Sequence, residues 1–148
     1  MSDVNLIGSF GPKNRWQKKV LSADVTATTL DISTTTGNSD FKFTGLEIGK
    51  HYEIYVASLL IATLGDHQLD LFTVHDGQDI LRNYGGNPMD SGGSGDGKTI
   101  SNRLIFKATA STLTFKLSSV GSGSILVSTW THAILIERND LEDEVSIW

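Results

Sequence analysis

The sequence predicts an all-β domain, a jelly-roll sandwich of two antiparallel sheets with roughly eight or nine strands. Three observations support this fold class. Apolar and polar residues alternate along several segments, most clearly at Leu113, Phe115 and Leu117. The longest apolar stretch is rich in β-branched and aromatic residues. Turn signals interrupt the chain at the short intervals that are typical of a sandwich.

The composition is that of one globular domain. The chain has 148 residues, of which 39% are hydrophobic and 20% charged, so it can bury a single core. A formal net charge of -5 argues against nucleic acid as a partner. The absence of cysteine excludes disulfides and thiolate chemistry. Neither a secretory signal nor an apolar run of membrane-spanning length is present, so we expect synthesis in the cytoplasm and no membrane partner.

The N-terminal part is expected to be an extended arm, residues 1–19, in front of a jelly-roll domain at 20–138. The arm has no sustained period and ends in a basic cluster made of Lys13, Arg15, Lys18 and Lys19. Residues 25–33 have the composition of a strand, and residues 41–46 alternate as a short strand does. Turn residues at 36–39 separate these two segments.

The centre of the chain, residues 46–81, is predicted to contain two long strands joined by a polar turn at 65–67. The remaining strands would be added around this pair. Asp76-Gly77 is the next turn signal, because this dipeptide tolerates the positive φ angles of tight hairpins. A short strand is expected after that turn, at 78–84.

The second half begins with a loop at Gly85–Gly97, which is rich in glycine and serine and is therefore expected to be flexible. In the division of the domain, the flexible loop is taken as residues 85–99. Strands are expected at 100–108, at 113–118 and at 125–136, with Trp130 inside the last one. Residues 139–148 form an acidic tail that ends in Trp148.

A phosphate-binding pattern occurs in this loop, where Gly92–Thr99 satisfies GxxxxGKT. That chemistry needs a buried strand before the loop and a helix after it, whose N-terminal amides hold the phosphates. The upstream residues are not a hydrophobic strand, and the downstream residues 100–106 read as a strand. We therefore expect a loop without a nucleotide cofactor.

No catalytic or metal-binding pattern is visible. The four histidines show no HxH or HExxH spacing, and no GxSxG motif occurs. The carboxylates concentrate in the tail instead of opposing each other on strands. We expect a protein that is not an enzyme and that has neither cofactor nor metal.

The aromatic residues and the charged ends leave alternatives open. A sugar-binding platform could be formed by Trp16, Trp130, Trp148, Tyr52, Tyr55 and Tyr84. Core packing explains Tyr55 and Trp130 as well, because both lie in apolar segments. Trp148 would pack on its own sheet or on another chain. The basic residues 13–19 and the acidic residues 140–144 are either solvated ends or a contact between neighbouring subunits.

Several segments resemble a known class of modules. Residues 16–25 (WQKKVLSADV) and 43–52 (FTGLEIGKHY) look like the opening of jelly-roll modules in tailed-phage virion proteins. Residues 129–138 (TWTHAILIER), followed by a tail ending in tryptophan, look like their close. These modules are similar in layout to the C1q and tumour-necrosis-factor-like fold, and the resemblance covers residues 16–148. It implies a homotrimer whose interface would contain Tyr52, Tyr55, Trp130 and Trp148.

The resemblance implies a virion structural protein. Because the chain starts at Met1 and has no fibre shaft or repeat, we expect a capsid decoration (cement) protein that forms trimeric knobs on the surface of the phage head. Its partners would be itself and the major capsid protein. The residues expected to contact the capsid are Leu6, Ile7, Phe10, Lys13, Arg15 and Trp16.

Three other functions fit less of the sequence. The first is a receptor- or glycan-binding module at a tail or fibre tip, with host glycan bound by the loop 85–97 and exposed aromatic residues. The second is a small carbohydrate-active enzyme, which would need a carboxylate pair that is not visible. The third is a C1q-like trimer outside viruses, which would more naturally carry a secretory signal.

Overall fold

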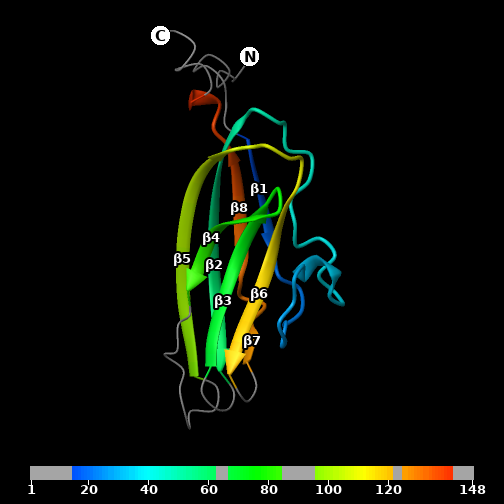
Figure 1. Cartoon of the computed structure of the whole chain (residues 1–148), viewed down its shortest axis with the longest axis vertical. Helices are drawn as coiled ribbons and strands as arrows, with labels where there is room; N and C mark the ends of the chain where they lie inside the picture. The colour runs from blue at the N-terminus through cyan, green and yellow to red at the C-terminus, as the bar shows by residue number, and fades with distance from the viewer. Residues whose placement is uncertain (1–14, 63–66, 85–95, 122–124, 142–148) are drawn as a thin grey trace, which may run out of the picture.

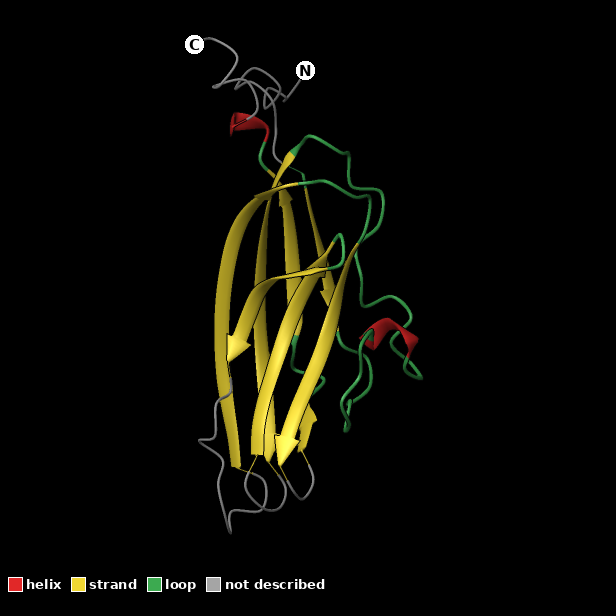
Figure 2. Ribbon diagram, in the orientation of Figure 1, coloured by secondary structure: helices red, strands yellow, loops and turns green. Residues whose placement is uncertain are grey.

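The computed structural model of the chain is a sandwich of two antiparallel sheets (Figure 1). It describes residues 15–62, 67–84, 96–121 and 125–141. These residues form eight strands and two single-turn 3-10 helices, Ile32–Thr34 and Asn139–Leu141 (Figure 2). None of the described helices is long and apolar enough to cross a membrane. The predicted all-β jelly-roll fold is therefore confirmed.

The sandwich has a larger and a smaller sheet, and the smaller one lies in front in Figure 1. The larger sheet has the strand order β1 (Trp16–Val20), β8 (His132–Glu137), β2 (His51–Ala62) and β5 (Asp96–Lys107), with β7 (Ile125–Val127) paired to the end of β2. The smaller sheet has the order β4 (Gln78–Tyr84), β3 (His67–His75) and β6 (Leu113–Gly121).

The core lies between the two sheets and follows the period-2 pattern. In β6, Leu113, Phe115 and Leu117 all point inward and are fully buried, as their alternation predicts. The Phe115 ring lies 4.6 Å from the ring of Phe41 and 6.2 Å from that of Phe43, centroid to centroid. Each such buried side chain stabilises the fold by about 2 kcal/mol.

The two central strands do not pair with each other, contrary to the sequence-based prediction. β2 pairs with β5, β7 and β8 in the larger sheet, whereas β3 pairs with β4 and β6 in the smaller one. The physical reason is burial: in opposite sheets, Ile54 and Val56 of β2 share one core with Leu69 and Leu71 of β3.

The segment 21–50 runs along one side of the sandwich without a regular strand (Figure 1). The strands suggested at 25–33 and 41–46 are reduced to single bridges, such as Phe43 with Leu113. The buried Asn38 holds the segment together: its Oδ1 accepts from two backbone N–H groups, and its Nδ2 donates to Ala23 O and Thr35 Oγ1. Side-chain bonds therefore replace a ladder here.

The long strand expected at 125–136 is broken. Two residues of β2, 58–59, lie opposite four residues of the partner, 128–131, because the pairing jumps from Leu60–Val127 to Ala57–His132. The Thr131 hydroxyl accepts the Leu59 N–H at 3.1 Å, a bond that the ladder would otherwise supply. This bulge turns Trp130 out of the sheet, so that it is 50% exposed instead of packed in the core.

Two further expectations concern the start of the sandwich and the turn between β3 and β4. Residues 16–19, expected as the end of an arm, belong to β1, which pairs with β8 over five residues. The Asp76-Gly77 turn is confirmed: both residues have positive φ angles, 53° and 75°, and they connect β3 to β4.

Candidate functional site: the outer face of the larger sheet

The outer face of the larger sheet follows from the alternation of β2. Ile54 and Val56 point into the core, so Glu53, Tyr55 and Ala57 point outward. The strand register places their neighbours in rows across β1, β8, β2 and β5. The rows are Trp16, Ile136, Glu53 and Ile105; then Lys18, Ile134, Tyr55 and Arg103; then Val20, His132, Ala57 and Ser101.

An apolar strip covers the β1–β8 half of this face. It consists of Trp16 and Val20 on β1 with Ile134 and Ile136 on β8, and we call it the β1–β8 strip. Trp16 is 65% exposed and Val20 is 52% exposed, whereas the two isoleucines are half-buried. None of the four contributes to the buried core. Lys18 lies between Trp16 and Val20 in the middle row, so the strip is continuous along β8 and interrupted on β1. Exposed apolar side chains gathered on one sheet face make it a candidate contact surface.

One carboxylate interrupts the first row. Glu53 is only 8% exposed, and Arg138 Nη1 donates to its Oε1 at 2.7 Å while Arg103 Nη1 donates to its Oε2 at 3.3 Å. Arg138 also holds Asp140 through two nitrogens, at 3.0 and 2.8 Å. The hydrogen bonds that Arg138 donates to Asp140 and, to a smaller extent, to Glu53 raise the pKa of its guanidinium above its ordinary value. Glu53 is thus neutralised within its own chain.

A cleft opens on the β5 side of the same face, and we call it the aromatic cleft. It has a volume of about 140 Å³ and is lined by Tyr55, Ala57, Thr99, Ile100, Ser101 and Trp130. The ring of His132 lies 5.4 Å from the Trp130 ring and 6.3 Å from the Tyr55 ring, centroid to centroid. Small residues in the floor and large rings in the walls produce the hollow.

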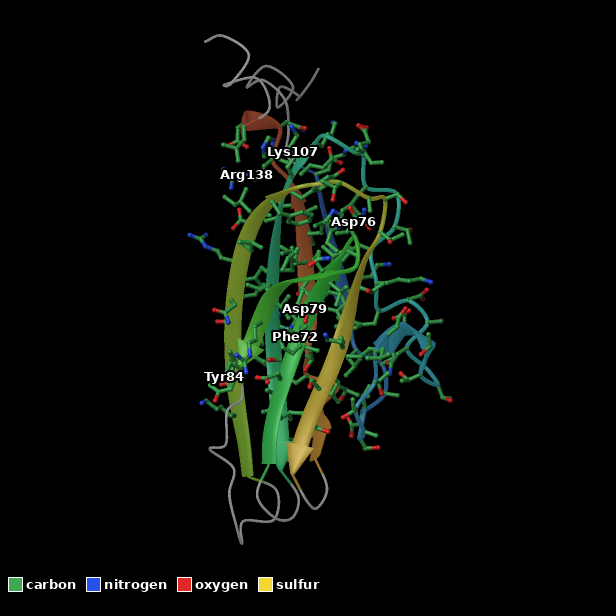
Figure 3. The ribbon with its side chains drawn as sticks, in the orientation of Figure 1. Phe72, Asp76, Asp79, Tyr84, Lys107 and Arg138 are labelled. Carbon is green, nitrogen blue, oxygen red and sulfur yellow. The ribbon has the colours of Figure 1, made fainter. Side chains whose placement is uncertain are left out.

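The smaller sheet presents a different outer face. The Phe72 ring, labelled in Figure 3, lies 4.7 Å from Lys116 Nζ and 5.7 Å from Arg82 Cζ. Asp79 holds Lys116 at 2.8 Å, and the buried Asp70 holds Arg82 at 2.9 Å. Cations of the same chain therefore cover the outward aromatic ring, which stabilises it by cation–π attraction.

The structure separates the residues predicted for a trimer interface. Tyr52 is inside the core, where its hydroxyl accepts the Glu47 N–H at 2.9 Å and its ring stacks on Phe106. It therefore has almost no surface to offer a second chain. Tyr55 and Trp130 lie together at the aromatic cleft. Trp148 lies outside the described residues.

Of the residues predicted to contact a capsid, Leu6, Ile7, Phe10 and Lys13 also lie outside the described residues. Arg15 precedes β1, and its Nη2 lies 3.0 Å from Glu137 Oε2. Trp16 is the first residue of β1 and belongs to the β1–β8 strip. The two described residues are thus part of the sandwich edge and not of a separate arm.

Sequence reasoning missed three residues of the strip, namely Val20, Ile134 and Ile136. A signal was available in β8, where the run Ala133 to Ile136 is apolar at every position. An antiparallel strand with one wet face alternates, so an unbroken apolar run indicates that both faces are covered.

The loop pattern GxxxxGKT has the wrong surroundings for a nucleotide. Its last two residues, Lys98 and Thr99, lie in β5, which is a strand and not a helix. The loop residues before Asp96 lie outside the described residues. Among the histidines, His75 is a core residue whose Nδ1 lies 2.9 Å from Thr112 O and whose Nε2 accepts the Thr109 N–H.

Comparisons with known proteins support the fold. No protein-family model and no curated protein matches the sequence. The structure is similar to a chain of the infectious bursal disease virus Gx strain, with a TM-score of 0.55, 10% identity, and 88% of this chain and 34% of that chain covered. It is also similar to the VP2 subviral particle of the same virus, with a TM-score of 0.51, 10% identity, and 88% and 34% covered.

This chain spans about a third of the length of those viral chains. A tumour necrosis factor, Eiger from S. frugiperda, has a TM-score of 0.45 at 12% identity, with 87% of this chain and 88% of that chain covered. At such identities the viral likeness concerns the fold. The chain is a jelly-roll domain whose fold it shares with these viral chains.

Proposed function

We propose that this chain is a non-enzymatic structural protein of a virion. In this proposal it is a capsid decoration (cement) protein that forms trimeric knobs on a phage head. The shared fold with viral capsid chains supports the general role. The observation that carries the proposal is the β1–β8 strip, because it gives the domain a surface for its own copies.

The position of the strip favours a closed ring of copies. Trp16 and Val20 lie on β1, an edge strand of the larger sheet, and the isoleucines lie on the adjacent β8. An apolar surface at one edge can contact a different surface of the next copy around a rotation axis. Three copies that bury the strip in this way form a compact knob, and the charged smaller sheet then faces outward.

The capsid contact is assigned to residues 1–14, with Arg15 at the junction. Trp16 is assigned to the neighbouring copy instead, because it belongs to the strip. A chain that lacks residues 1–14 should fold and associate normally and should no longer bind capsids that lack the protein. Capsid binding by the shortened chain would contradict this assignment.

Two measurements test the main proposal. Sedimentation equilibrium should give a trimer, and a monomer at all concentrations would exclude the knob. Quantitative mass spectrometry of purified virions should find about as many copies as of the major capsid protein, or one trimer for each three-fold position. A few copies per particle would indicate a tail protein, and complete absence would overturn the virion role.

A second candidate is a receptor-binding module at a tail or fibre tip. The aromatic cleft favours it, because binding sites commonly combine aromatic walls with a few polar groups on a rigid scaffold. The copy number per virion separates this candidate from decoration.

A further inference from the structure

The aromatic cleft is a preformed hollow with a rigid wall. Trp130 sits on the bulge between β7 and β8, whose backbone is fixed at both ends: Thr131 N donates to Ser128 O at 2.9 Å, and Thr131 O accepts from Leu21 N at 3.0 Å. The adjacent Thr129 N–H is held by the Asp24 carboxylate at 3.0 Å. A ligand would therefore meet an indole whose backbone is already ordered, which lowers the entropy cost of binding.

The imidazole of His132 sets the orientation of the wall. Its ring meets the Trp130 ring nearly edge-on, at an interplanar angle of 71°. The indole is therefore in contact with a second ring of the protein, and half of the Trp130 surface remains exposed. β7 and β8 both pair with β2, so this turn lies between the two pairings, opposite residues 58–59 of β2. A flat apolar surface next to a hollow is available for stacking.

The floor of the cleft is polar and uncharged. None of the six lining residues carries a charge. The hydroxyls of Thr99 and Ser101 are exposed on β5, and neither bonds to any residue that the structure describes. A hydroxyl can donate one hydrogen bond and accept others. An entirely apolar ligand would bury these groups without partners, at a cost in free energy, and an anionic ligand would find no cation in the lining.

We propose that the aromatic cleft binds one ring of a neutral sugar, a pyranose in an uncharged glycan. The sugar would place an apolar C–H face on Trp130 and its ring hydroxyls against Thr99, Ser101 and the phenol of Tyr55. A pyranose has both kinds of surface, and the cleft of about 140 Å³ is of the size of one ring. The proposal gives a ligand class to the second candidate function, but the site itself does not depend on the protein's place in a virion.

The site is compatible with self-association. The β1–β8 strip lies over β1 and β8, and the cleft extends from the β7–β8 bulge across β2 to β5, so the two surfaces share no residue. The proposal therefore removes Tyr55 and Trp130 from the expected trimer contact and places them at the border of a subunit, where a glycan can reach them.

Saturation-transfer NMR on the full chain tests the proposal, with the methyl pyranosides of glucose, galactose, mannose and N-acetylglucosamine as probes. At least one probe should receive saturation at millimolar concentration, and Trp130→Ala should weaken its binding by about tenfold or more. Thr99→Val keeps the shape of the side chain and should weaken binding severalfold. Transfer to none of the probes, or transfer that Trp130→Ala leaves unchanged, would overturn the proposal.

Trp16→Ala is the matched control, since it removes another exposed tryptophan from the same sheet face outside the cleft. It should weaken self-association and leave the sugar signal intact. Failure of the self-association prediction concerns the β1–β8 strip, and failure of the sugar-binding prediction concerns the aromatic cleft. The two proposals can therefore be tested separately. Amide NMR spectra of each variant establish that it is folded.

Discussion

The two outer faces of the sandwich handle an apolar side chain in different ways. On the smaller sheet, Lys116 and Arg82 cover Phe72, and carboxylates hold both cations in place. On the larger sheet, none of the described residues covers Trp16 and Val20 in this way, and both are more than half exposed. The first face is complete within one chain, whereas the second is the face that our proposal assigns to self-association. The comparison of the two faces therefore gives the proposal its tests.

The strongest test of the comparison adds charge to the strip. The double variant Trp16→Glu/Val20→Glu should weaken self-association by about 100-fold, because two carboxylates would have to be buried in the contact. Sedimentation equilibrium over a concentration series measures this change. Leu30→Glu is the matched control, since Leu30 is 77% exposed but lies outside the larger sheet. Equal association of both variants would mean that the strip is not the contact.

A second test makes the larger face more apolar. Glu53→Leu should tighten self-association by about tenfold, because the row from Trp16 to Ile105 would then be apolar throughout. The free energy of unfolding should fall by about 1.5–3 kcal/mol, since Arg138 loses its hydrogen bond to Glu53 and keeps only that to Asp140. Sedimentation and urea unfolding measure the two effects. Weaker association would show that Glu53 itself takes part in the contact.

A third test acts on the smaller sheet. Phe72→Ala removes the ring that Lys116 and Arg82 cover, and it should lower the free energy of unfolding by about 1 kcal/mol. Self-association should stay the same, because this face is expected to point away from the neighbouring copy. Urea unfolding and sedimentation on one preparation are sufficient. A change in self-association would mean that the smaller sheet takes part in the contact, contrary to our proposal.

The smallest effect is expected from removing Lys116, one of the two cations that cover Phe72. Lys116→Ala should lower the free energy of unfolding by about 0.5 kcal/mol, since it removes one cation–π contact and one partly exposed ion pair. Because salt screens exposed charges, the difference from the unchanged protein should shrink at 1 M salt. A difference that is independent of salt would assign the effect to packing alone.

Local patterns identified part of the fold correctly. The alternation at 113–117 gave the inner face of β6, and Asp76-Gly77 gave the turn between β3 and β4, because both depend on neighbours in sequence. The partners of β2 and β3 depend on tertiary packing instead, so the expected central pair was wrong. The break at 128–131 was missed for a similar reason, since the Thr131 hydroxyl replaces a ladder bond that no period reveals.

The candidate site was predicted only in fragments. Tyr55 and Trp130 were expected at a subunit contact, and the structure brings them together at a cleft. Tyr52 has the same side chain as Tyr55, but the two residues are an odd number of positions apart in β2. Their side chains therefore point to opposite faces of the sheet, and Tyr52 lies on the core side. Thr99 and Ser101 gave no signal, because a hydroxyl in a strand is common and only the fold places it beside an indole.

The edge position of β1 couples the local stability of this strand to self-association. In the described part of the chain, β1 pairs with β8 alone, and none of its side chains is buried. Such a strand opens at little cost in free energy. Two of the four strip residues lie on this strand. A neighbouring copy that binds the strip therefore binds only the state in which β1 is paired with β8. Amide exchange in β1 should then slow as protein concentration rises, which makes local folding and assembly one linked equilibrium.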